Sequence, residues 1–104
     1  MAEVSRLKLH EELCDLLGSR NAYFQPPESI KLTHPCIVYS RSNIRIRKAD
    51  NRIYNGMDEY EITHITPDPD DPFHDSIMNH FEMISYDRGF TSDNMYHNVY
   101  RIYY

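Results

Sequence analysis

The last ten residues constrain the fold more than any other part of the chain, because aromatic and branched side chains alternate up to the final residue. From Met95 to Tyr104 the sequence is Met-Tyr-His-Asn-Val-Tyr-Arg-Ile-Tyr-Tyr. Alternation with a period of two, rich in Tyr, Val and Ile, predicts a β-strand. Chain ends fray unless something holds them. We therefore expect this strand to be paired inside a sheet, with no tail or anchor after it.

The start of the chain has the spacing of a helix. The segment 4–17 places one apolar stripe opposite a charged face, and Gly18 is a natural C-terminal stop. The stripe consists of Leu9, Leu13, Leu16 and Leu17. We expect this helix to belong to the core.

A second helix is expected after the acidic, proline-rich segment 67–72. Asp71 suits the N-cap, and Pro72 suits the first helical position. Apolar residues continue at helical spacing as far as Ile84. Residues 83–86 also fit the start of a strand that follows a shorter helix, and both alternatives stay open.

Further strands and turns complete the predicted order of elements. Strand-like segments occupy 21–24, 36–48 and 58–66. Turn signals occur at 49–52, 55–56 and 87–89, and Asp93-Asn94 precedes the terminal strand. Helices segregated beside a mostly antiparallel sheet make an α+β domain. We expect one domain over residues 1–104, with two helices packed against a mostly antiparallel or mixed sheet.

Charge and cysteine usage limit the function classes. The net charge of −5 argues against a general nucleic-acid binder, which carries a basic excess. The start of the chain lacks the apolar core of a signal peptide, and no apolar run is long enough to span a membrane. Synthesis in the cytoplasm is expected. Cys14 and Cys36 are expected to be free thiols in the core, and a disulfide between them is the alternative.

The residues that usually carry chemistry do not form a recognisable catalytic motif. None of the six histidines pairs at the helical spacing of a zinc protease, and the sequence lacks GxSxG, GxxxxGK and GxGxxG. His64 with Asp68 and Asp70 is a weak alternative, an oxygen-rich cation site in what we expect to be a solvated acidic loop. We predict a protein that is not an enzyme, with no cofactor, no metal and no catalytic residues.

Two clusters of opposite charge are the candidate interface residues. The basic cluster comprises Arg41, Arg45, Arg47, Lys48 and Arg52. The acidic cluster comprises Glu59, Glu61, Asp68, Asp70 and Asp71. The basic cluster fits a solvated strand face. It fits equally well a contact patch for an acidic partner or for DNA that passes nearby. Opposed patches on one subunit also suit head-to-tail assembly, because a heterologous contact repeated by rotation closes a ring.

The order of segments resembles a family of virion proteins. The resemblance is most specific at Phe24-Gln25-Pro26-Pro27-Glu28, at Pro35-Cys36-Ile37-Val38-Tyr39 and at the Asp93-Asn94 ending with its closing Tyr-Tyr. Over nearly the whole chain these segments are similar to the tail terminator, or tail completion, proteins of long-tailed bacteriophages. His34 stands where that family usually has Tyr. The shared motifs are structural, so they imply no catalytic residues.

The resemblance implies a structural protein at the head–tail junction of the virion. It implies an α+β subunit that forms a hexameric ring, caps the tail tube and presents the joining surface to the head connector. The implied partners are further copies of the chain, the tail tube protein and the connector or neck proteins. DNA would pass through the ring lumen without specific binding, and no membrane is involved. A neck or head-completion adaptor is the alternative within the virion, and a small metal-binding enzyme is the alternative outside it.

Overall fold

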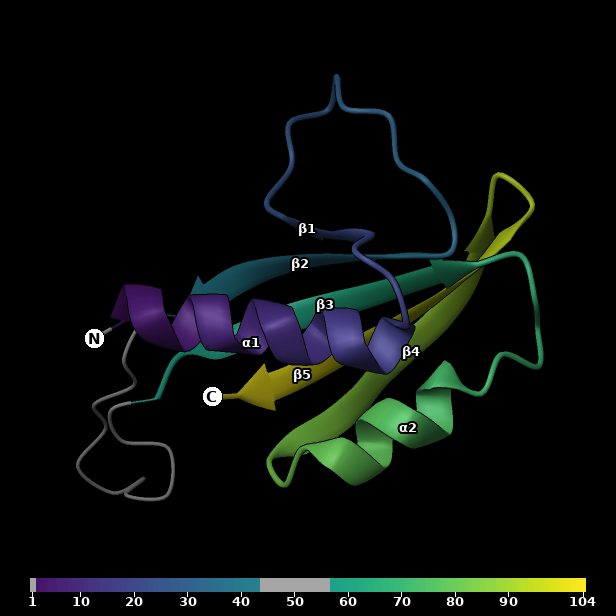
Figure 1. Ribbon diagram of the computed structural model, residues 1–104. Helices are drawn as coiled ribbons and strands as arrows, with labels where there is room; N and C mark the ends of the chain where they lie inside the picture. The colour runs from purple at the N-terminus through teal and green to yellow at the C-terminus, as the bar shows by residue number, and fades with distance from the viewer. Residues whose placement is uncertain (1, 44–56) are drawn as a thin grey trace.

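A five-stranded mixed sheet and two helices make up the fold. The structure, a computed structural model, describes residues 2–43 and 57–104 of the chain. The elements in these residues are α1 (Ala2–Leu17), β1 (Ala22–Phe24), β2 (Cys36–Asn43), β3 (Glu59–Thr66), α2 (Phe73–His80), β4 (Ile84–Ser92) and β5 (Met95–Tyr103). The strands lie in the order β1-β2-β3-β5-β4, with β1 parallel to β2 and every other neighbouring pair antiparallel (Figure 1). The predicted α+β class is confirmed.

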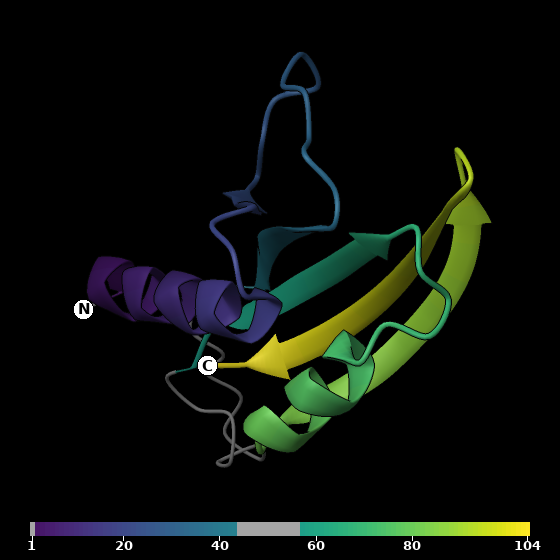
Figure 2. The ribbon, with the colours of Figure 1, turned by 45° about the vertical axis from the view of Figure 1, so that its right-hand side comes forward.

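Both helices lie against the same face of the sheet (Figure 2). The core between the layers contains Leu9 and Leu13 of α1 and Phe73 and Ile77 of α2. The strands contribute Ile37, Tyr39, Tyr60, Ile62, Tyr100 and Ile102 to it. Period-two alternation places these strand residues on the helix-covered face, and their neighbours along each strand on the other face.

The first helix ends where the sequence predicts. Gly18 has a φ of +81°, and its N–H donates to the carbonyl of Cys14 at 2.9 Å. A positive φ at this point suits glycine, which has no Cβ to clash. Leu9 and Leu13 are fully buried, whereas Leu16 and Leu17 are partly buried at the rim of the core. The predicted core role of the helix is confirmed.

The second helix is short, so the alternative with an early strand is confirmed. It begins at Phe73, with Pro72 as the N-cap, one residue later than expected. Asp71 still caps it in effect, because its Oδ1 accepts the Phe73 N–H at 2.9 Å. Phe81 is already extended, and Ile84 opens β4. Leaving the helix lets the side chains of Phe81 and Ile84 pack against the core.

The expected turn at 87–89 is wrong. These residues lie inside β4, where the register shifts between Tyr86 and Arg88. Such a β-bulge bends and twists a strand without reversing it. The chain reverses instead at Asp93 and Asn94, with φ of 53° and 62°. A two-residue hairpin turn of type I′ needs positive φ at both positions, which Asp and Asn tolerate.

The terminal strand is paired in the sheet, as predicted, and it lies between two other strands. Strand β5 pairs with β3 from Tyr103 opposite Glu59 to Tyr96 opposite Thr66, and with β4 on its other side. The described part of the predicted strand 36–48 is β2, which reaches Asn43. The rest of that strand and the predicted turns at 49–52 and 55–56 lie outside the described residues.

Candidate assembly surfaces

Arg41, a member of the basic cluster, has a largely buried side chain that packs within the fold. It lies opposite Tyr60 in the sheet, on the helix-covered face. Its Nε is 3.6 Å from Oδ2 of Asp58, and the two side chains are only 19% and 5% exposed. The guanidinium also lies over the rings of Phe24 and Tyr60, at 5.8 and 5.7 Å from their centroids. Arg41 is therefore an internal ion-pair partner at the end of β2, unlike the exposed strand residue expected.

The other basic residues lie outside the described residues. They are Arg45, Arg47, Lys48 and Arg52. Their expected role as an assembly patch stays a prediction from the sequence.

Glu59 and Glu61 lie on the sheet face that the helices leave uncovered, in an ion-pair network around Arg101. The Arg101 guanidinium is 2.9 Å from Glu59, 3.8 Å from Glu61 and 3.6 Å from Asp87. The hydrogen bond to Glu59 is the main reason that the pKa of Arg101 is raised. These carboxylates already have an internal partner, so they are only partly available to a second molecule.

The remaining acidic residues lie at the far end of β3. Asp68, Asp70 and Asp71 are in the loop between β3 and α2. About 17 Å of strand separates Glu61 from Thr66, where this loop begins. The predicted acidic cluster is thus two separate groups, and only the loop group lines a pocket together with His64.

The β4–β5 hairpin carries exposed aromatic side chains that were not expected from the sequence. Strand β4 forms one edge of the sheet, and all its residues after Ile84 are exposed. Tyr86, Phe90 and Tyr96 are three of the five large apolar side chains found exposed in the described residues. Phe90 stacks on His97 with ring centroids 4.7 Å apart. Alternation alone did not reveal this surface, because it does not tell an edge strand from a central one.

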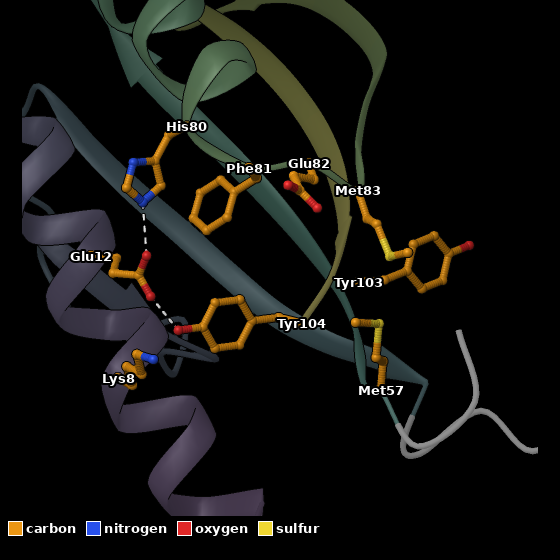
Figure 3. A pocket seen from close by; sticks show the side chains of 9 residues that line it. All are labelled: Lys8, Glu12, Met57, His80, Phe81, Glu82, Met83, Tyr103 and Tyr104. Atoms are coloured by element: carbon orange, nitrogen blue, oxygen red, sulfur yellow. Dashed lines mark hydrogen bonds and ion pairs between the residues drawn. The ribbon is translucent and has the colours of Figure 1, made fainter. Parts of the chain in front are cut away.

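A pocket of about 460 Å³ lies where α1, the start of β4 and the chain end meet (Figure 3). Glu12 lies on the α1 side of the pocket between His80 and Tyr104, accepting hydrogen bonds from Nε2 of His80 at 2.7 Å and from the Tyr104 hydroxyl. Burial alone would raise the pKa of Glu12, but these two bonds outweigh it and hold the pKa below its usual value. Burial, then the bond to Glu12, raises the pKa of Tyr104. The network therefore joins both helices to the last residue through an ionised carboxylate.

The thiols show no sign of nucleophilic chemistry. Cys14 and Cys36 are free and buried, as predicted. Burial raises the pKa of Cys36 to about 11 and also raises that of Cys14. A thiol attacks as the thiolate, so both are poorly reactive near neutral pH. Within the described residues, no three His, Cys, Asp or Glu side chains gather closely enough to hold a metal ion.

Neither described helix is long and apolar enough to cross a membrane. The longer one, α1, has 16 residues and carries charged side chains, whereas a span needs about 20 mostly apolar residues. Comparisons of the chain with protein-family models, with curated proteins and with solved structures each gave no match.

Proposed function

We propose that this protein is a structural subunit of a phage virion, a tail terminator that assembles as a hexameric ring at the head–tail junction. The ring would cap the tail tube and offer the joining surface to the head connector. The family part of the proposal is supported by the order of segments, above all the Phe24–Glu28 loop and the Pro35–Tyr39 strand. The α+β fold, with a pinned terminal strand, agrees with it.

The observation that carries the assembly part is the exposed edge strand β4. An edge strand offers unpaired N–H and C=O groups, and proteins usually shorten, charge or cover it. Here the edge is nine residues long. The features that hinder pairing with another strand are the bulge and the charged side chains of Asp87 and Arg88. The second half of the strand, from Gly89 to Ser92, has no bulge and no charged side chain, and it carries the exposed Phe90. A subunit that gains neighbours on assembly accounts for this edge, because pairing would cover it.

Localisation in the particle tests the proposal. A small epitope tag at the N-terminus, with antibody labelling of purified virions, is expected to mark one band at the head–tail junction. Labelling along the tube, at the distal tip or nowhere on the particle would contradict the proposal. Monomers in dilute solution would not contradict it, since ring closure can need the tube end as a template.

Tail length separates the terminator from the neck adaptor. A cap stops growth of the tube, so phage lacking this protein are expected to make tails of irregular, excessive length. Tails of normal length that fail to join heads would assign the protein to the neck instead. Electron micrographs of lysates from the deletion strain, with a plasmid copy of the wild-type chain as control, supply this measurement.

A further inference from the structure

A second pocket, of about 660 Å³, lies between the β3–α2 loop, the first turn of α2 and the β4–β5 strands. Four carboxylates line it, those of Asp68, Asp70, Asp71 and Asp75, and no lysine or arginine does. Among the described residues none of the four forms an ion pair with Lys or Arg. The pocket therefore concentrates negative charge with no counter-cation from the part of the chain that the structure describes, and such a site favours a cationic ligand.

His64 is independent evidence for a ligand, because one of its ring nitrogens lacks a hydrogen-bond partner. Its side chain is 2% exposed on the wall of this pocket, and its Nε2 has no hydrogen-bond partner. The nearest charged atom, Oδ2 of Asp71, is 3.9 Å away and already accepts the Thr66 hydroxyl at 3.0 Å. Buried polar atoms are normally hydrogen-bonded, so an orphan needs an explanation. A donor group that bonded to His64 Nε2 while lying against the Asp71 carboxylate would supply the missing partner.

The protonation state of His64 agrees with a donor ligand. Burial lowers the pKa of His64 to about 4, and the nearby Asp71 only partly opposes this. The ring is therefore neutral at pH 7 and adds no positive charge to the pocket. A neutral imidazole has one nitrogen that accepts a hydrogen bond.

The polar groups of the pocket distinguish a metal ion from an organic cation. No three potential ligands among the described residues converge on one point, as Ca²⁺ or Zn²⁺ requires. The acceptors are instead spread along the loop, and the rings of His74 and Tyr86 line the same pocket, 5.4 Å apart. A guanidinium has five donors in a plane and packs well on aromatic rings, unlike a compact ammonium.

We propose that this pocket binds an arginine side chain of another protein chain, through the Asp68–Asp71 carboxylates and His64. Asp68 uses one carboxylate oxygen to accept the Asp70 N–H at 2.9 Å, which orders the loop and leaves its other oxygen available. The site does not depend on the proposed virion function. Its arginine comes from a second copy or from a different partner.

The probe is N-acetyl-L-arginine amide, and N-acetyl-L-citrulline amide is its neutral, nearly isosteric control. NMR spectra of the histidine rings are expected to show a saturable shift of His64 with the arginine probe and none with citrulline. Asp68→Asn with Asp70→Asn is expected to weaken binding by about tenfold or more, because charge-assisted hydrogen bonds are lost. Asp15→Asn with Glu28→Gln removes the same charge from exposed positions outside the pocket and is expected to leave binding unchanged.

Three outcomes would overturn the site: equal binding of citrulline, unchanged arginine binding in the Asp68/Asp70 variant, or Ca²⁺ or Mg²⁺ displacing the probe at the same residues.

Sedimentation of concentrated protein identifies the source of the arginine. Self-association that both the variant and excess probe abolish assigns it to a second copy. Unchanged sedimentation alongside specific probe binding assigns it to a different protein. Because probe binding is measured on the isolated chain, its failure is distinct from failure of the virion proposal.

Discussion

Asp58 holds the guanidinium of Arg41 at 3.6 Å beneath the end of β2, with both side chains largely buried. The same aspartate exchanges backbone hydrogen bonds with Tyr104, at 3.1 and 3.0 Å. One residue thus connects the start of β3 to the last residue of the chain and to the neighbouring strand. The first arginine of the basic cluster has a role in stability that its sequence neighbourhood does not suggest.

Replacing Arg41 with Met is expected to destabilise the fold by about 3 kcal/mol, because a buried carboxylate loses its counter-charge. Urea unfolding followed by circular dichroism measures the change. Arg20→Met is the matched control, since Arg20 pairs with Glu11 in an exposed bridge. Its unfolding midpoint is expected to stay at the wild-type value. An Arg41 variant as stable as the wild type would restore the interpretation of Arg41 as an exposed contact residue.

Leu13→Ala is expected to cost roughly 2–5 kcal/mol, since Leu13 is fully buried and its removal leaves a cavity. Leu7 lies on the same helix, 54% exposed, and provides the comparison. Leu7→Ala is expected to change the free energy of unfolding by less than about 0.5 kcal/mol. Similar values for the two variants would show that α1 is not packed as described.

The stability of the fold is expected to fall between pH 6.5 and about pH 4 because of His64. Burial lowers the pKa of His64 in the folded state from 6.5 to about 4, so in this window the unfolded chain binds the proton and the folded chain does not. Protonation therefore favours unfolding as the pH decreases, by up to about 3 kcal/mol for the whole shift. Above pH 6.5 the histidine is neutral in both states and has no effect.

The pH effect is measured by comparing variants, because carboxylates titrate in the same range. Unfolding free energies of wild type and His64→Leu at pH 7 and pH 4.5 are expected to differ in slope, with the steeper loss in the wild type. His34→Gln, at an exposed histidine, is expected to keep the wild-type slope. Equal slopes for wild type and His64→Leu would contradict the buried, neutral state of His64.

Phe90→Ser is expected to weaken ring formation while leaving the monomer as stable as the wild type within about 0.5 kcal/mol. The side chain is 45% exposed on the edge hairpin, so its loss opens no cavity. Ile30→Ser removes a similarly exposed apolar side chain from the β1–β2 loop and is expected to assemble normally. Electron microscopy of rings formed on tube ends gives the comparison. Normal assembly of the Phe90 variant would exclude the hairpin from the interface.

Arg45→Glu together with Arg47→Glu is expected to leave the monomer folded and to weaken ring formation or tail binding. Like charges brought together across an interface cost several kcal/mol. Complementation of a phage deletion by a plasmid copy measures the effect as infectivity. A double variant that assembles normally and restores infectivity would mean that these arginines are merely solvated.

Local patterns were sufficient for the elements whose signal lies within one turn of helix or one strand. The leucine stripe with Gly18 predicted α1, and the aromatic alternation predicted β5. The proline and aspartate that open α2 were misplaced by only one residue. In each case the signal is backbone periodicity or the restricted conformations of Gly and Pro. Both act on residues close together in the chain, so both can be recognised in the sequence.

The α+β class, the core leucines and the pairing of the chain end could all be predicted from the sequence. Three features emerge only when the strands are packed together: β4 is an edge strand, it has a bulge between Tyr86 and Arg88, and Arg41 is paired with Asp58. Packing also brings His64 beside the carboxylates of the β3–α2 loop. Strand order and the partners of a buried charge depend on contacts between residues far apart in the chain. Periodicity indicates which face a residue takes, whereas packing of the whole molecule determines what that face meets.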